Sequence, residues 1–313
     1  MNTISAKRMI YPVKSEADLF GNTHMMNIYR GCNHGCIYCD SRSECYQGGR
    51  PSGDFGVVHA KENALFLIER ELQARKKSKQ VTVGTGSMSD PYNHFEKESE
   101  LTRGALRLFD KYKCGVLVIT KSALVSRDAD LYSQIQTHSP VNVGITVTTA
   151  DPKICRKIEP AVSSPTERFQ AIRKFADAEV FAGVHMNPIL PYITDSKENI
   201  RQIIEKSAES GAKYVLCYGF GMTLRKGNRE YYYENLEKHW PGLKEKYEKT
   251  YGEKYNCRCE NAAELSAVFK EECKNHGLLY KIEEINRAWK NEKKPEKQKC
   301  LFDFEDLKAD NEQ

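Results

Sequence analysis

Three cysteines on one short stretch have the clearest chemistry in this sequence. Cys32, Cys36 and Cys39 stand in the run Cys-Asn-His-Gly-Cys-Ile-Tyr-Cys, separated by three and then two residues. This spacing places three thiolates on a single loop, where they can face one metal centre. Iron–sulfur clusters usually take four cysteines. Three would leave one iron open to a further ligand, as a reactive metal site requires.

Other sites could use the same cysteines. A structural zinc site or a closed [4Fe–4S] site needs a fourth ligand, for which His34 and Cys45 are the nearby candidates. Zinc sites usually combine two short ligand pairs, which this single run does not match. A disulfide is a weaker explanation, because eleven cysteines is an odd number and the sequence opens without an apolar secretory signal.

The run resembles the signature of the radical S-adenosylmethionine (SAM) superfamily, C-x3-C-x-aromatic-C, with Tyr38 in the aromatic position. The resemblance implies that the open iron of a [4Fe–4S] cluster binds the amino and carboxylate groups of SAM. It further implies that the reduced cluster cleaves SAM to methionine and a 5′-deoxyadenosyl radical, which abstracts hydrogen from a substrate. The cofactor carries the difficult chemistry, while the protein supplies geometry and excludes solvent and oxygen.

Residues 20–220 alternate β-rich runs with amphipathic helical stretches, which predicts βα units and a parallel sheet. We expect six strands, at residues 23–30, 80–85, 115–120, 141–148, 179–186 and 213–218. Ser164-Pro165-Thr166-Glu167 is a helix start with a capping box. Six units predict an α/β fold, a partial (β/α)6 TIM-like barrel, and the superfamily resemblance implies the same.

After Gly221 the sequence becomes charged and tyrosine-rich, with helical stretches at 225–251, 261–274 and 281–290. We therefore expect a radical SAM core domain over residues 1–224. A helical C-terminal extension over residues 225–313 would pack on the barrel.

Composition is that of a soluble globular enzyme, with 40% hydrophobic and 29% charged residues. No apolar run approaches the roughly 20 residues that cross a bilayer, so we expect no membrane partner. Free thiols and an oxygen-sensitive cluster favour the cytoplasm. The net charge is +5, with part of the excess in lysines 290, 293, 294, 297 and 299. Such a run is usually a solvated surface, although it would also suit a nucleic acid.

Ligands of parallel α/β barrels bind at the C-terminal ends of the strands. The expected strand ends form a polar, glycine-rich rim at residues 84–92, 120–122, 146–149, 185–188 and 218–221. Each segment alone could be an ordinary loop or helix cap. Together with the cysteine loop, the set favours a binding site.

The whole pattern resembles the spore photoproduct lyase-like branch of the superfamily. The resemblance rests on the run Tyr29–Cys39, on Ser89-Asp90-Pro91-Tyr92 with Glu96, on Thr120-Lys121-Ser122 with Arg127-Asp128, and on Leu301-Phe302. It covers most of the chain and is more specific than the cysteines alone. We favour Arg127 and Asp128 as a structural pair that caps the helix they begin.

The resemblance also implies roles for individual residues. Lys121 would hold the SAM carboxylate or ribose by charge-assisted hydrogen bonds, and Thr146 would donate to the same ligand. The Tyr38 backbone would contact the adenine. Ser122 and Asp90 are further candidates for the SAM site.

Two departures concern the reaction. Spore photoproduct lyases carry a hydrogen-donating cysteine three residues before the strand-two aspartate, where this chain has Ser87. A serine O–H bond is too strong to quench a carbon radical. The lyases also have tyrosine after the third cysteine, where this chain has Asp40. Both changes argue against thymine-dimer reversal. The hydrogen donor and the catalytic residues stay unknown, with Cys217 as the first candidate for a surrogate donor.

The C-terminal cysteines and a basic, aromatic stretch have plain explanations. Cys257, Cys259, Cys273 and Cys300 could hold an auxiliary cluster, but they match no pattern for one, and a buried apolar role is commoner. Lone His185 is expected to be a satisfied core or rim residue. Arg225, Lys226 and Arg229 lie beside Tyr231–Tyr233. Stacking and phosphate contacts there would suit a nucleic acid. A helix that packs its tyrosines on the barrel would explain the same residues as well or better.

The sequence thus predicts an enzyme that cleaves SAM reductively with a [4Fe–4S] cluster and abstracts hydrogen from an unknown substrate. A nucleic acid leads by family analogy alone, and a reductant such as flavodoxin or ferredoxin would supply electrons. Alternatives are radical modification of a peptide or small metabolite, a non-catalytic [4Fe–4S] redox protein, and a zinc-stabilised nucleic-acid module. Lys121 and Thr146 disfavour the redox protein, because an electron carrier needs no SAM pocket.

Overall fold

The computed structural model describes residues 2–13, 20–49, 52–75 and 80–291. Leu301-Phe302, Cys300 and the lysines after residue 291 lie outside these ranges. None of the described helices is both long and apolar enough to span a bilayer.

A seven-stranded sheet forms the centre of the molecule, with the strand order β10-β9-β8-β7-β6-β3-β2. Its strands are β2 (Tyr11–Pro12), β3 (His24–Met25), β6 (Thr82–Thr85), β7 (Gly115–Thr120), β8 (Val141–Thr146), β9 (Ala182–His185) and β10 (Val215–Leu216). The six from β3 to β10 pair in parallel, and β2 pairs antiparallel with β3 at one edge. The α/β fold with six parallel strands is therefore confirmed. The described strands form an open sheet, with β10 and β2 at its edges.

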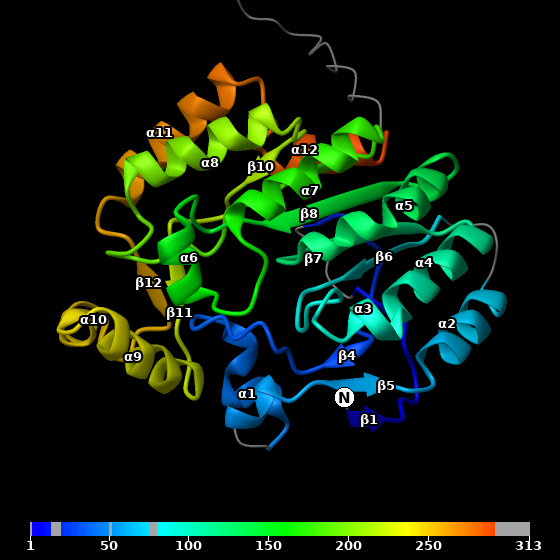
Figure 1. Ribbon diagram of the computed structural model, residues 1–313, viewed down its shortest axis with the longest axis horizontal. Helices are drawn as coiled ribbons and strands as arrows, with labels where there is room; N and C mark the ends of the chain where they lie inside the picture. Colours follow the sequence, from blue (N-terminus) through cyan, green and yellow to red (C-terminus); the bar gives the residue numbers. More distant parts are fainter. Residues whose placement is uncertain (1, 14–19, 50–51, 76–79, 292–313) are drawn as a thin grey trace, which may run out of the picture.

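Helices cover the outer side of this sheet in an arc (Figure 1). The covering helices are α2 (Ala64–Gln73), α4 (Leu101–Lys111), α5 (Ala129–Gln136), α7 (Pro165–Asp177) and α8 (Lys197–Glu209), whereas α6 (Pro152–Ile158) lies inside the arc and packs toward residues 36–38. The expected capping box begins α7, since Ser164 Oγ accepts from the Glu167 amide at 3.3 Å and Glu167 Oε2 accepts from the Ser164 amide at 2.7 Å. Shorter elements are α1 (Glu44–Gln47), α3 (Glu96–Ser99), and the 3-10 helices η1 (Asp40–Arg42), η2 (Ser52–Gly56) and η3 (Ala123–Asp128).

The central strands are buried on both faces. Every residue of β6, β8 and β9 is buried, and so are five of the six in β7. This is the environment of parallel strands that helices cover, and it explains their continuous apolar runs, such as Val116–Ile119. Each buried valine or isoleucine contributes about 1.5–3 kcal/mol, so the strand ends are held on a rigid base.

The expected first strand, residues 23–30, divides in two. After Met26, whose amide bonds to the Gly84 carbonyl at 2.9 Å, the chain leaves the main sheet. It then forms β4 (Tyr29–Arg30), which pairs antiparallel with β5 (His59–Lys61). β5 also pairs in parallel with β1 (Asn2–Ile4). Residues 59–61 are therefore strand, and the first long helix begins only at Ala64. A run of extended residues does not by itself reveal that it changes sheets.

Residues 221–291 pack on the barrel. Their elements are β11 (Gly221–Thr223), α9 (Asn228–His239), α10 (Leu243–Tyr251), β12 (Asn256–Arg258), α11 (Ala262–Asn275) and α12 (Ile282–Trp289). β11 and β12 form an antiparallel pair, and α11 lies along α8 (Figure 1). Leu265, Phe269 and Cys273 of α11 belong to the same hydrophobic core as the central strands.

Candidate functional site

The loop that carries the three cysteines begins directly after β4. Gly31 opens it at φ +79°, and a Cβ there would lie 2.3 Å from the Val57 carbonyl oxygen, so only glycine fits. Cys36 is buried and Cys32 and Cys39 are partly exposed. None of the three forms a disulfide, which leaves all three thiols available as ligands.

Neighbouring segments anchor this cysteine loop on several sides. The anchoring bonds join Cys32 N to Phe55 O (2.9 Å), Ser89 Oγ to Gly31 O (2.9 Å), Ile37 N to Ile158 O (3.0 Å) and Ala161 N to His34 O (3.1 Å). The partners come from three separate parts of the chain. The position of the loop therefore depends on the tertiary structure.

His34 forms an ion pair with Asp90, with 3.3 Å between Nδ1 and Oδ2, and both side chains are buried. Burial acts to lower the pKa of His34, but the Asp90 charge and bonds to Asp90 and Cys32 outweigh it and raise that pKa to about 10. An imidazolium has no lone pair to give a metal. His34 is thus unsuited to be the fourth ligand of a zinc site.

The thiols suit a cluster better than a single ion. Among the described residues, no group of three or more His, Cys, Asp or Glu side chains is arranged to hold one metal ion. The three thiols are nevertheless neighbours, because the charges of Cys32 and Cys39 raise the pKa of Cys36, which burial already raises strongly. Each cysteine of an iron–sulfur cluster binds a different iron, so the three sulfur atoms must lie near one another but need not point at one shared metal position. The residues present therefore fit a [4Fe–4S] cluster.

Lys121, at the end of β7, faces the cysteine loop. Its ammonium lies 5.7 Å from the centre of the Tyr38 ring, and it makes no hydrogen bond or ion pair with any residue in the described ranges. Burial acts to lower the pKa of Lys121, yet Cys36, Glu159, Cys39 and Asp90 raise it overall. A charged, half-buried group without a protein partner indicates a place for an anionic or polar ligand.

Asp90 positions this lysine. One carboxylate oxygen accepts from the Lys121 amide (2.8 Å), and the other accepts from Thr120 Oγ1 (2.6 Å) and the Tyr92 amide (2.8 Å). Ser122 caps η3, because its Oγ accepts from the Leu124 amide at 3.3 Å. Both oxygens of Asp90 thus have protein partners, which suits a positioning role better than a ligand contact.

Tyr38 and Thr146 meet through two residues that the sequence reading missed. The buried Tyr38 hydroxyl donates to Glu159, and Arg168 bonds to both Glu159 and the Thr146 carbonyl. A signal for Arg168 existed, because Arg168, Ile172 and Phe175 lie on one helical face at i, i+4 and i+7. Nothing in the sequence marked Glu159.

His185 is buried at the end of β9 and only half satisfied. Its Nε2 lies 3.1 Å from the Tyr214 hydroxyl, whereas Nδ1 has no partner among the described residues. Burial, with a smaller contribution from the Lys121 charge, lowers the pKa of His185 to about 3. Tyr214 donates to Asn142 at 2.9 Å, so the neutral ring donates through Nε2 and keeps Nδ1 as an acceptor.

Cys217, the first candidate for a surrogate hydrogen donor, is only partly buried and keeps the S–H bond that such a donor needs. It packs against the main hydrophobic core, and its thiol donates to the Gly219 carbonyl at 3.4 Å. Burial raises the pKa of Cys217 to about 11, so the thiol keeps its proton. The next residue, Tyr218, is 52% exposed, and the Lys121 charge reaches its phenol. Tyr218 therefore presents more surface to a ligand.

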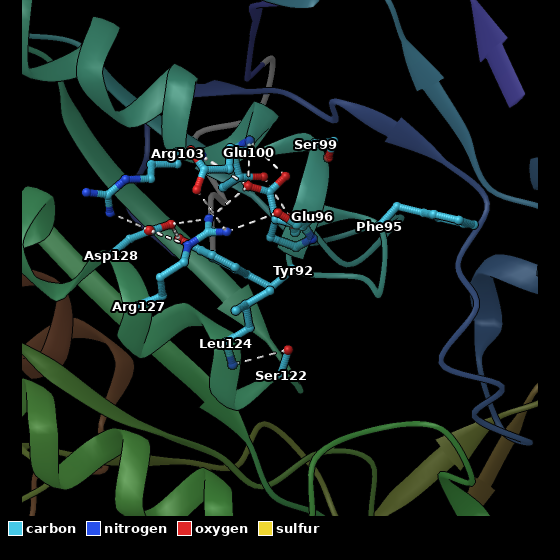
Figure 2. Close-up of polar contacts among 12 residues, drawn as sticks. Tyr92, Phe95, Glu96, Ser99, Glu100, Arg103, Ser122, Leu124, Arg127 and Asp128 are labelled. Carbon is cyan, nitrogen blue, oxygen red and sulfur yellow. Dashed lines mark hydrogen bonds and ion pairs between the residues drawn. The ribbon is translucent and has the colours of Figure 1, made fainter. Parts of the chain in front are cut away.

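Arg127 and Asp128 form a structural network (Figure 2). Arg127 lies between the two buried carboxylates, with 3.1 Å from Nη2 to Glu96 Oε1 and 2.7 Å from Nε to Asp128 Oδ1. Arg103 reaches Asp128 at 2.6 Å, and the Tyr92 hydroxyl donates to Asp128 at 2.9 Å. Arg127 and Asp128 are therefore a structural pair, but the expected capping is wrong, because the Asp128 side chain makes no capping hydrogen bond at the start of α5.

The C-terminal cysteines and basic residues also have structural places. Cys257, Cys259 and Cys273 are buried free thiols in apolar clusters. The guanidinium of Arg229 donates to the carbonyls of Leu224, Gly252, Glu253 and Lys254, and Tyr232 and Tyr233 are buried. Packing on the barrel therefore explains this stretch better than nucleic-acid binding.

Comparisons with known proteins agree on one family. The model of the radical SAM superfamily matches residues 26–206, more than half of the chain. An uncharacterized protein of Mycobacterium tuberculosis is 30% identical over 230 residues, 73% of this chain and 67% of that protein. An uncharacterized protein of Methanocaldococcus jannaschii is 30% identical over 240 residues, 76% of this chain and 83% of that one.

Solved structures of spore photoproduct lyase share the fold. A variant matches with a TM-score of 0.65 and 15% identity, over 89% of this chain and 80% of the lyase. The lyase complexed with dinucleoside spore photoproduct matches with a TM-score of 0.63 and 16% identity, over 88% and 80%. At such low identity the likeness establishes the partial-barrel architecture, whereas the substrate is a separate question.

Proposed function

Because this chain belongs to the radical SAM superfamily, we propose that Cys32, Cys36 and Cys39 hold a [4Fe–4S] cluster whose fourth iron binds SAM. When bound, the cluster and SAM supply an electron and a radical that abstracts hydrogen from a substrate. The observation that carries the proposal is the unpartnered Lys121 ammonium beside the three thiols. The chain is a radical SAM enzyme, and its reaction is the open question.

The strand ends provide the groups that would bind SAM. Lys121 would hold the carboxylate or a ribose hydroxyl, since a charge-assisted hydrogen bond suits either. Thr146 and Ser122 would add hydroxyl contacts, and the Tyr38 backbone would contact the adenine. For Asp90 we propose an indirect role, in which its carboxylate holds Lys121 and His34 in place.

A non-catalytic redox protein is the weaker candidate. An electron carrier has no use for a lysine ammonium that faces the cysteine loop without a hydrogen-bond partner among the described residues, whereas SAM offers it a carboxylate and ribose hydroxyls. SAM chemistry does require a one-electron reductant, for which flavodoxin or ferredoxin is our candidate. We assign the SAM chemistry to a core domain over residues 1–224 and propose residues 225–313 as an extension that supports it.

A nucleic acid or nucleotide is our leading substrate class, on family analogy alone. Thymine-dimer reversal is not proposed, because Ser87 replaces the donor cysteine and stands exposed on its loop. Radical modification of a peptide or a small metabolite is the alternative. Nothing in the arrangement of Arg229 and the buried tyrosines favours nucleic acid over these.

The cofactor assignment is tested on protein purified without oxygen. We expect about four irons per chain and release of 5′-deoxyadenosine on addition of dithionite and SAM. Cys36→Ala should abolish both, whereas Cys273→Ala, which changes a buried thiol of the core, should keep both. Zinc in place of iron would refute the proposal. Iron without SAM cleavage would leave the redox protein.

The substrate is tested by deuterium transfer. Labelled DNA, RNA and peptide pools are incubated separately with reduced enzyme and SAM, and deuterium is sought in 5′-deoxyadenosine. Transfer from a DNA or RNA pool alone supports the leading class. Transfer from peptides alone overturns it.

A further inference from the structure

The turn between α6 and α7 holds the cysteine loop at two backbone points and one side chain. The backbone bonds are Ile37 N to Ile158 O (3.0 Å) and Ala161 N to His34 O (3.1 Å). Between them, the Tyr38 hydroxyl donates to Glu159 Oε1. Tyr38 stands between the second and third cysteines, so this bond reaches the part of the loop that carries two of the three thiols.

Glu159 is buried, at 1% exposure, and has a full set of donors. Besides Tyr38 it accepts from Thr148 Oγ1 at 3.0 Å and from Arg168 Nη2 at 2.5 Å. Its pKa is lowered, because the charges of Arg168 and Lys121 and the bonds from Tyr38 and Arg168 outweigh burial. The carboxylate is therefore ionised next to the cysteine loop.

Arg168 extends this contact to the end of β8. Nη1 donates to the Thr146 carbonyl and Nε donates to the Ser163 carbonyl, both at 2.8 Å. The chain of bonds Tyr38–Glu159–Arg168–Thr146 therefore joins the cysteine loop to the strand end that faces it. All four residues are at most 5% exposed.

A buried ion pair of this kind contributes little net stability, because desolvation offsets most of the attraction. A phenylalanine at position 38 would fill the same aromatic site without a buried hydroxyl to satisfy. The presence of Tyr38, Glu159 and Arg168 together in this chain therefore needs another reason. Their geometry supplies one, since it fixes the distance between the loop and the strand end.

We propose that Glu159 is a positioning residue with two effects. Through Tyr38 it fixes the cysteine loop against the end of β8, and through its negative charge it lowers the reduction potential of the bound cluster. The second effect rests on the proposed function, whereas the first concerns the protein chain alone. Glu159 bonds directly to Tyr38, which stands between two of the three ligand cysteines, so its charge lies close to the site of the cluster.

The positioning effect is tested on the cluster-free protein by amide hydrogen exchange. Tyr38→Phe removes only the hydroxyl, and a hydrogen bond to a charged group contributes about 1.5–3 kcal/mol. We expect exchange in residues 32–39 to become at least about tenfold faster, as that energy implies. Thr148→Val is the matched control, because it removes a different donor to the same carboxylate, and it should leave loop exchange near the wild-type rate. Unchanged exchange in Tyr38→Phe would overturn the positioning role.

The electrostatic effect is tested by redox titration of the cluster, followed by electron paramagnetic resonance. Glu159→Gln keeps the size and an acceptor oxygen but removes the charge, so the midpoint potential should shift positive. The double variant Glu159→Gln/Arg168→Met is again neutral as a pair, and its potential should return towards the wild-type value. A structural disturbance alone would not reverse in this way.

The outcomes separate this inference from the proposed function. A wild-type protein that holds no iron–sulfur cluster refutes the function, and the exchange experiment still decides the positioning role. A wild-type protein that holds the cluster, with the same potential in Glu159→Gln, overturns the electrostatic effect. If Glu159→Gln does not fold, Arg168→Met decides instead, because it leaves the Glu159 charge without its counter-charge; its potential should shift negative, and an unchanged potential would contradict us.

Discussion

Two groups of buried charges lie beside β7, and they differ in whether every charge has a partner. The first, the paired group, consists of Glu96, Arg103, Arg127 and Asp128. The second, the site group, consists of His34, Asp90, Lys121, Glu159 and Arg168.

In the paired group, each buried carboxylate meets an arginine and a tyrosine hydroxyl. Asp128 accepts from Arg103, Arg127 and Tyr92 (Figure 2), and Glu96 accepts from Arg127 and from Tyr29. The site group contains two ion pairs, His34–Asp90 and Arg168–Glu159. The Lys121 ammonium forms no ion pair among the described residues. The difference teaches that complete pairing serves the fold, whereas an incomplete set marks the place where a ligand belongs.

The contrast between the two groups would be wrong if a member of the paired group could be removed without lowering the free energy of unfolding. Asp128→Ala leaves Arg103, Arg127 and the Tyr92 hydroxyl without their buried acceptor, so the free energy of unfolding should fall by about 3–5 kcal/mol. Urea denaturation measures it. The control is Asp130→Ala, which removes a 60%-exposed partner of the same Arg103 and should change stability by no more than about 1 kcal/mol. Equal effects of the two variants would contradict the paired interpretation.

The site group should respond in the opposite way. Lys121→Met removes a charge that has no described protein partner, so the unfolding free energy should stay near the wild-type value. SAM affinity, measured by equilibrium binding to the cluster-loaded protein, should fall about 10- to 100-fold, as expected for a charge-assisted hydrogen bond of about 1.5–3 kcal/mol. Lys226→Met, which changes an exposed lysine paired with Glu44, should bind SAM normally. A Lys121 variant that is unstable but binds SAM would reverse the comparison.

A pH titration sharpens the contrast at His185, which belongs to neither group. Its folded pKa of about 3 lies below the ordinary value of 6.5, so the unfolded chain binds a proton that the native ring excludes. This contribution to stability is full above pH 6.5 and is lost as the pH falls from 6.5 towards 3, by up to about 1.4 kcal/mol per pH unit. Urea unfolding at pH 7 and 5 should show a smaller decline in His185→Gln. Identical declines in the wild type and in His185→Gln would mean that His185 has its ordinary pKa in the folded protein.

The sequence was informative where a function depends on neighbouring residues. The three thiols share one loop, and the strand ends carry Lys121 and Thr146, because local patterns specify both the cysteine spacing and the βα units. The sheet confirmed five of the six expected strands as single elements, with ends that differ by at most three residues, and the strand at 115–120 matches at both ends. The first divided into β3 and β4, because an extended run carries no mark of the sheet it joins.

Contacts between distant segments could not be predicted. The cysteine loop meets residues 158–161 more than a hundred positions away, and the His34–Asp90 pair spans 56 positions. The sequence placed Asp90 among the candidate SAM contacts. The hydrogen bonds of Asp90 in the structure favour a positioning role. The sequence also made Cys217 the first hydrogen-donor candidate, which stays a prediction, and it did not single out the exposed neighbour Tyr218.

The sequence by itself determined the family, the six-stranded α/β architecture and the identity of the three thiols. Periodicity and spacing are properties of adjacent residues, so no fold is needed to read them. The tertiary structure alone decided which charges are matched. Pairing depends on which side chains from separate strands and turns come within a few ångströms, and burial then sets the cost of leaving one unpaired. That is why Lys121 differs from Arg127, although both follow the same strand.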